Sequence, residues 1–149
     1  MKKILIGTHN KGKFKEISYL LSKKIKKISP QKLKIKSPKE TGKTFKANAE
    51  LKANYFSKFT NLPVISDDSG LCIQALNNNP GIYSARLAKR HGGFLKAMKF
   101  ILKKMKKKFN RKATFVCSLS YKTKFGKIIT AEGRINGKIS DKIVGKKGF

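Results

Sequence analysis

Residues 62–71 read LPVISDDSGL, and this stretch organises our interpretation of the whole chain. The apolar residues around 64–65 predict a short buried strand, and Gly70 predicts a turn after it. Asp67 and Asp68 would then lie at the end of that strand, where α/β proteins place their ligands. Two carboxylates at such a place indicate a site for a hard divalent cation. The alternative is a polar turn that caps the strand.

The composition is that of one folded domain with a large positive charge. The chain has 149 residues, of which 39% are hydrophobic, and it includes ten phenylalanines, which argues against disorder. The chain has 37 Lys and Arg residues but only seven Asp and Glu residues, so the formal net charge is +30. Two of the three aspartates are the neighbours Asp67 and Asp68, which makes that pair unusual in this chain.

No stretch of the sequence predicts a membrane segment. No apolar run approaches the roughly 18 residues of a membrane span, and Gly7-Thr8-His9-Asn10 interrupts the basic and apolar start too early for a signal peptide. Cys72 and Cys117 lie in strand-like segments without metal-ligand spacing, so we expect reduced core thiols. These features predict a cytoplasmic protein with no membrane partner.

The charge also raises the alternative of a non-catalytic, lysine-rich nucleic-acid-binding module. However, 33 of the 37 basic residues are lysines, and they are spread over every segment of the chain. Sequence-reading surfaces favour arginine, and stacking surfaces need aromatic residues among basic ones on one face. We therefore expect no specific nucleic-acid partner.

The N-terminal residues predict a strand, a polar loop and a helix. The strand covers Lys3–Gly7, and an apolar stripe predicts a helix from the loop to about Ile28. A polar loop between a buried strand and a helix start exposes backbone N–H groups at the positive end of the helix dipole, so it can hold a phosphate. A plain turn between strand and helix is the alternative. The loop residues are Thr8, His9, Asn10, Lys11, Gly12 and Lys13.

The rest of the chain reads as further helices and strands. Thr44 predicts the cap of a helix over Thr44–Phe59, which carries Lys52, and Arg86 stands out because lysine is the usual cation here. The other expected elements are a short strand at Leu33–Ile35, a strand at Leu71–Leu76, a turn at Asn77–Gly81, a helix over Gly93–Phe109, paired strands at Ala113–Tyr121 and Lys127–Ile135 around Gly126, and a short strand within Lys138–Val144.

Five segments follow one another along the chain: Thr8-His9-Asn10-x-x-Lys13, Glu40-Thr41-Gly42-x-Thr44-Phe45-x-x-Asn48-Ala49-x-x-Lys52-Ala53, Leu62-Pro63-x-x-x-Asp67-Asp68-Ser69-Gly70-Leu71, Pro80-Gly81-x-Tyr83-Ser84-Ala85-Arg86 and Ala113-x-Phe115-Val116-Cys117. In this order they resemble one family, the inosine/xanthosine triphosphate pyrophosphatases. Each is a modest signal, but together they cover nearly the whole chain. His9 stands where a glycine is common in the family.

The resemblance implies an α/β fold with an elongated central mixed sheet, flanking helices and two lobes around a nucleotide cleft. It implies Mg²⁺-dependent hydrolysis of purine nucleoside triphosphates such as ITP, dITP and XTP to the monophosphate and pyrophosphate, and a homodimer. A sister class with a similar fold, the septum-inhibitor-like nucleotide pyrophosphatases, is the alternative. The segment from Glu40 to Ala53 favours the purine-directed family.

The resemblance also implies roles for individual residues. The loop from Thr8 to Lys13 would hold phosphate, chiefly through Thr8, Asn10 and Lys13. Asp68 would accept the proton of the attacking water. Glu40, Asp67 and Asp68 would be the metal carboxylates, and Ser69, Lys52 and Arg86 would contact the substrate.

Residues 1–149 would form a single pyrophosphatase-like domain that lacks the family's C-terminal segment. Family members are longer, and this sequence stops at Gly148-Phe149, where their Gly-Phe-Gly-Tyr-Asp segment begins. The resemblance places the groups that read the base beyond that point. We therefore expect these 149 residues to hydrolyse triphosphates slowly and without base preference, because discrimination needs polar groups that only one base satisfies.

Overall fold

The computed structural model describes residues 2–145. Gly148-Phe149, where the family's C-terminal segment was expected to begin, lies outside the described residues. The chain forms two compact units. Unit 1 contains residues 1–68 and 118–132, and unit 2 contains residues 69–117 and 133–149. The chain passes between the units three times, each time within a strand.

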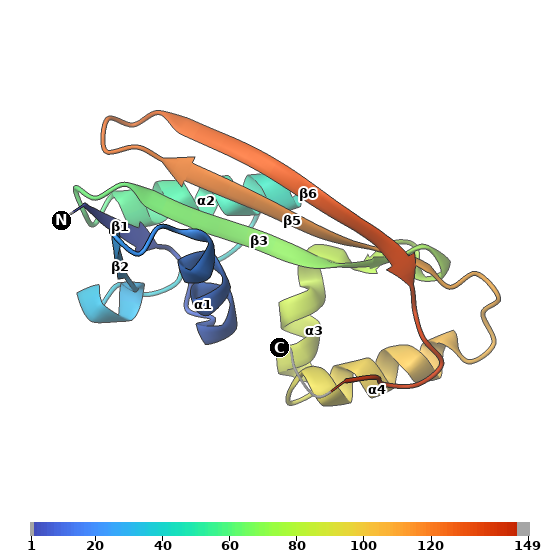
Figure 1. Ribbon diagram of the computed structural model, residues 1–149. Helices are drawn as coiled ribbons and strands as arrows, with labels where there is room; N and C mark the ends of the chain where they lie inside the picture. The colour runs from blue at the N-terminus through green and yellow to red at the C-terminus, as the bar shows by residue number, and fades with distance from the viewer. Residues whose placement is uncertain (1, 146–149) are drawn as a thin grey trace. The chain divides into compact units, whose positions relative to one another are not determined.

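A mixed sheet of six strands runs through residues 2–145, in the order β2-β1-β3-β5-β6, with β4 paired to β3 (Figure 1). β1 is parallel to both β2 and β3, whereas β4 is antiparallel to β3. The strands are β1 (Lys3–Ile6), β2 (Lys26–Ile28), β3 (Val64–Ile73), β4 (Asn79–Pro80), β5 (Lys112–Lys122) and β6 (Ile128–Lys138). The expected mixed α/β fold is confirmed.

In unit 1, helices cover strands β1 and β3 on both faces of the sheet. Alternate residues of a strand point to opposite faces, and the continuous apolar run of β1 follows from this double burial. Helix α1 (Lys11–Leu20) packs on one face through Ile17, with Ile4, Ile6 and Ile65. Helix α2 (Phe45–Ser57) packs on the other through Phe56, with Leu5 and Val64.

Helix α2 follows the sequence closely. Thr44 caps it, because its hydroxyl accepts a hydrogen bond of 3.0 Å from the backbone N–H of Ala47. The buried apolar residues of α2 are Phe45, Ala49, Ala53 and Phe56.

Two expectations near the N-terminus were wrong. Helix α1 ends at Leu20, and Ile28 lies in strand β2 instead of on an extended helix. Lys26–Ile28 pairs with Lys3–Leu5, and this sheet pairing overrides the helical spacing of the isoleucines. The strand expected at Leu33–Ile35 does not form, because Leu33 ends a 3₁₀ helix over Pro30–Leu33 and Lys34 is its left-handed cap, with a φ of 55°.

Strand β3 runs straight through Gly70, so the expected turn there was wrong, and Asp67 and Asp68 lie inside the strand. Gly70 allows a close contact with a neighbouring segment instead of forming a turn. A Cβ at this position would lie 2.2 Å from the carbonyl oxygen of Gly81 and 2.6 Å from Oγ of Ser84. Glycine inside a strand often marks such an approach of another backbone segment.

Unit 2 is built on helices α3 (Ser84–Arg90) and α4 (Phe94–Met105), and α3 was not expected. Ile73, Met105 and Ala113 form its core cluster. On α4 the buried residues are Ala97 and Met105. Phe94 and Met98 of the same helix are exposed. Short 3₁₀ helices cover Gln74–Leu76 and Gly81–Tyr83.

The C-terminal part of the described chain forms a hairpin and then a loop. β5 and β6 are confirmed as neighbours joined by a turn at Gly126, whose φ is 92°. The short strand expected within Lys138–Val144 was wrong. The Arg111 guanidinium donates hydrogen bonds of 2.6 Å to the carbonyl oxygens of Ile139 and Ser140, which holds this segment as a loop. No helix within residues 2–145 has the length and apolar character of a membrane span.

Gly7→Ala should destabilise the fold. The added Cβ would lie 2.2 Å from Oγ of Ser66 and 2.6 Å from Cδ2 of Phe56, both of which are buried. We expect the free energy of unfolding to fall by about 1–3 kcal/mol, the usual cost of overpacking, as measured by urea denaturation. Gly133→Ala is the control, since nothing lies within 4 Å of its Cβ position. Equal stability of the two variants would contradict this packing.

Candidate functional site

The loop after β1 has a defined hydrogen-bond pattern. Oδ1 of Asn10 accepts hydrogen bonds from the backbone N–H groups of Gly12 (2.8 Å) and Lys13 (3.2 Å), so Asn10 caps helix α1. Oγ1 of Thr8 accepts a hydrogen bond of 3.2 Å from the backbone N–H of Asn10. Lys11 is exposed at the first position of the helix. The side chains of Thr8 and Asn10 therefore lie at the N-terminus of α1, where an anion is favoured.

His9 connects this loop to the segment that leads to Glu40. Its Nε2 lies 3.0 Å from the carbonyl oxygen of Ile35, and its Nδ1 lies 2.6 Å from Oγ of Ser37. A carbonyl can only accept, so Nε2 donates to the Ile35 oxygen, and Nδ1 forms the second hydrogen bond with the Ser37 hydroxyl. The histidine that replaces a common glycine thus has a structural role as a link between two loops.

The neighbours Asp67 and Asp68 have different partners because they point to opposite faces of β3. Asp67 faces helix α1, and its Oδ2 lies 2.7 Å from Nζ of Lys13. Asp68 faces helix α2, and its Oδ2 accepts a hydrogen bond of 3.0 Å from the side-chain amide of Asn48. Both carboxylates are buried. The strand thus delivers one carboxylate to each layer of helices.

Asn48 is the residue that our interpretation of the sequence left without a role. It is fully buried, and while its amide donates to Asp68, its Oδ1 accepts a hydrogen bond of 2.8 Å from the backbone N–H of Gly42. It therefore joins the strand carboxylate to the loop that carries Glu40. The sequence signal that could have identified Asn48 is a polar residue among the apolar positions of α2, because a buried amide needs hydrogen-bond partners.

Lys52 lies one helical turn after Asn48 and contacts two carboxylates. Its Nζ is 2.8 Å from Oε1 of Glu40 and 3.8 Å from Oδ1 of Asp68. Its side chain is 12% exposed, so the ion pairs are shielded from solvent. Positions four apart on a helix lie on the same face. The spacing of these two residues therefore brings an amide and an ammonium to the same carboxylate.

The charge state of Asp68 reflects this environment. Burial raises the pKa of its carboxyl group above the ordinary value of 3.8, and the charge of Glu40 adds to the increase. The ammonium of Lys52, the hydrogen bond from Asn48 and the ammonium of Lys13 act in the opposite direction, but burial dominates. The proton affinity of Asp68 is therefore above that of an exposed aspartate.

The carboxylates of Glu40 and Asp68 suit a magnesium ion. They converge on one cation, the Lys52 ammonium, which shows that the space between them favours positive charge. Mg²⁺ usually takes one or two carboxylates and completes its shell with water and phosphate oxygens. Within residues 2–145 no three His, Cys, Asp or Glu side chains cluster as metal ligands.

The predicted site residues divide between the two units. Thr8 to Lys13, Glu40, Lys52, Asp67 and Asp68 all belong to unit 1. Ser69 and Arg86 belong to unit 2, and the guanidinium of Arg86 lies 4.9 Å from the ring centre of Tyr83. The roles assigned to Ser69 and Arg86 as substrate contacts stay predictions, as does that of Asp67 as a metal ligand.

Asp68→Asn should increase the free energy of unfolding at pH 7, because the variant buries no charge there. As the pH falls toward 4, the wild-type carboxyl group takes up a proton more readily when folded than when unfolded, since burial raises its folded pKa. The wild type thus gains stability relative to the variant, and the difference shrinks. Denaturant titrations at several pH values measure this. A stability difference between variant and wild type that is the same at pH 7 and pH 4 would contradict this prediction.

Sequence comparison relates the chain to known proteins over nearly its whole length. The model of the Ham1 family matches residues 4–149 of the chain. A dITP/XTP pyrophosphatase of Borreliella burgdorferi is 42% identical over 157 aligned positions, which cover 100% of this chain and 76% of that protein. A dITP/XTP pyrophosphatase of Haemophilus influenzae is also 42% identical, over 99% of this chain and 78% of its own length.

Solved structures give the same result. The Ham1 protein of Coxiella burnetii superposes with a TM-score of 0.84 at 32% identity, over 100% of this chain and 78% of its own. The Staphylococcus aureus Ham1 protein superposes with a TM-score of 0.82 at 34% identity, over 99% of this chain and 77% of its own.

Proposed function

The chain belongs to the Ham1 family, and we propose that it hydrolyses non-standard purine nucleoside triphosphates to the monophosphate and pyrophosphate. The observation that carries the proposal is the buried cluster of Glu40, Lys52 and Asp68. Two carboxylates around one cation, close to a lysine-containing loop at a helix start, match the needs of a metal–triphosphate. The dITP/XTP pyrophosphatase names of the relatives support this substrate class and favour it over the septum-inhibitor-like alternative.

We propose that Glu40 and Asp68 hold Mg²⁺. When bound, the ion would neutralise the phosphate oxygens and the charge that develops on the leaving pyrophosphate. Lys52 pairs with the same two carboxylates, so it adds positive charge next to the metal position. The role of Asp67 as a third metal carboxylate stays a prediction, since its side chain lies on the opposite face of β3 from that of Asp68 and pairs with Lys13.

The remaining residues supply binding and proton transfer. Thr8, Asn10 and Lys13 surround the N-terminus of α1 and would bind phosphate there. Asp68 would accept the proton of the attacking water. Its raised pKa suits that task, because a general base works best when its pKa lies near the working pH.

A homodimer in the cytoplasm completes the proposal. The homodimer is implied by the family resemblance, and analytical ultracentrifugation would test it. Cys72 and Cys117 form no disulfide with each other, and a reducing compartment such as the cytoplasm keeps thiols in that state.

Asp68→Asn should lower kcat for ITP, dITP and XTP by at least about 100-fold, because general-base catalysis contributes roughly 10²–10⁴ to the rate. Pyrophosphate release is measured with these substrates and with dUTP, GTP and ATP. Asp141→Asn is the matched control, because this aspartate has a 93% exposed side chain and lies outside the cluster. Near-normal turnover by Asp68→Asn would contradict the assignment, and turnover of dUTP alone would favour the sister class.

Removal of divalent cations should abolish activity. We expect EDTA to stop pyrophosphate release and excess Mg²⁺ to restore it, while Glu40→Gln should raise the Mg²⁺ concentration needed for half-maximal rate by about tenfold. Loss of one charged ligand removes an interaction worth roughly 1.5–3 kcal/mol, which corresponds to that factor or more. Full activity in EDTA would show that the carboxylates do not act through a metal.

A further inference from the structure

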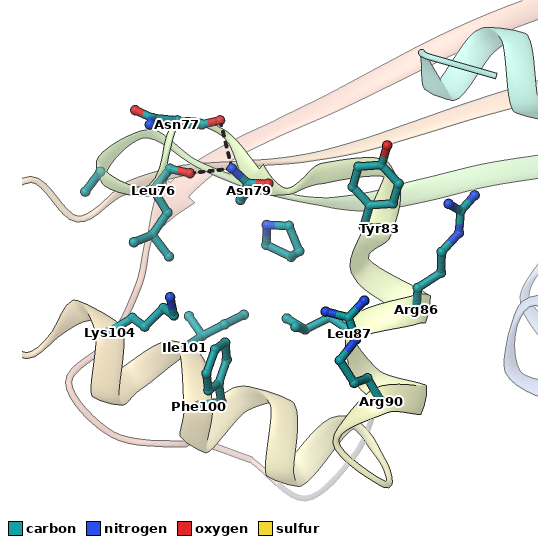
Figure 2. A pocket seen from close by; sticks show the side chains of 12 residues that line it. Leu76, Asn77, Asn79, Tyr83, Arg86, Leu87, Arg90, Phe100, Ile101 and Lys104 are labelled. Carbon is teal, nitrogen blue, oxygen red and sulfur yellow. Dashed lines mark hydrogen bonds between the residues drawn. The ribbon is translucent and has the colours of Figure 1, made fainter. Parts of the chain in front are cut away.

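Unit 2 contains an open pocket of about 680 Å³ between helix α3, helix α4 and the segment 75–80 (Figure 2). We refer to it as the α3–α4 pocket. Its apolar lining comes from half-buried side chains of all three elements, among them Leu76, Leu87 and Ile101. A volume of several hundred cubic ångströms is typical of sites for small ligands. The pocket shares no residue with the cluster of Glu40, Lys52 and Asp68.

The pocket is lined by cations and by no carboxylate. Arg86, Arg90 and Lys104 contribute to its wall, and the residues that line it include no Asp or Glu. Two of the four arginines in the whole chain therefore lie at one pocket, although lysine is the usual cation of this protein. The stretch 69–117 holds twelve Lys or Arg residues and no acidic residue. The cations that line the pocket favour an anion there.

Aromatic rings accompany these cations. The guanidinium carbon of Arg86 lies 4.9 Å from the ring centre of Tyr83, and Nζ of Lys104 lies 5.1 Å from that of Phe100. Tyr83 is 51% exposed, so its ring offers surface to a ligand. Aromatic faces and arginine planes bind planar rings by stacking. In Figure 2, Arg90 and Lys104 extend into the pocket from different helices, while Arg86 lies beside Tyr83.

We propose that the α3–α4 pocket binds a nucleoside monophosphate. Arg90 and Lys104 would bind the phosphate, since charge-assisted hydrogen bonds from arginine and lysine are the strong ones. The base would stack on Tyr83 and lie against the apolar lining. This makes the pocket a second nucleotide site, and it does not depend on the proposed hydrolysis, because no residue of the carboxylate cluster takes part.

The test measures AMP binding by calorimetry to the full chain with Asp68→Asn, in EDTA, so that neither metal nor turnover contributes. The double variant Arg90→Gln with Lys104→Gln should weaken AMP binding at least about tenfold, as expected for the loss of two charged contacts. Its control is Lys89→Gln with Lys103→Gln, which removes the same charge from neighbouring exposed positions on the same helices. That control should change Kd less than about twofold. Equal Kd values for the two double variants, or no saturable AMP binding, would overturn the proposal.

A second arm separates a nucleotide site from a simple anion site. Inorganic phosphate and adenosine should each bind at least about tenfold more weakly than AMP, because each offers only half of the contacts. Tyr83→Leu should weaken AMP binding and leave phosphate binding unchanged, whereas Tyr19→Leu, at an exposed position of α1, should affect neither. Phosphate that binds as tightly as AMP would show a general anion site and would refute the nucleotide. Circular dichroism of every variant checks that the fold is intact.

Discussion

The buried carboxylate of Asp68 is the constraint on which the arrangement of unit 1 depends. A buried charge is costly unless polar groups compensate it. The compensation comes from one face of helix α2, where Asn48 donates a hydrogen bond and Lys52 places its ammonium 3.8 Å away. The same two side chains hold the loop with Glu40, through the Gly42 amide and the Glu40 carboxylate. The position of this loop therefore follows from the need to stabilise one carboxylate.

The compensation is incomplete, because burial still raises the pKa of Asp68 despite its partners. Such a group lowers stability in its ionised form, and proteins retain such groups where function requires them. A divalent cation between Asp68 and Glu40 would supply the missing positive charge. The stability cost of the carboxylate and its proposed role as metal ligand and proton acceptor thus have the same physical origin.

The sequence predicts local features better than the relations between segments. The cap at Thr44, the buried face of α2 and the hairpin at Gly126 follow from patterns within a few residues. Gly70 was misread because a glycine in a turn and a glycine at a close backbone contact look the same in a sequence. The partners of Asp67 and Asp68 could not be predicted from the sequence for a related reason. The two side chains point to opposite faces only because the strand continues through both residues.

The most direct test follows the Asp68 carboxyl group itself by ¹³C NMR during a pH titration, without metal and with Mg²⁺. The account predicts a pKa above the ordinary value of 3.8 in the metal-free protein. With Mg²⁺ and a non-hydrolysable purine triphosphate bound, the pKa should fall, since a nearby positive charge favours the ionised form. A pKa that is the same in both states would contradict the claim that this carboxylate binds the metal.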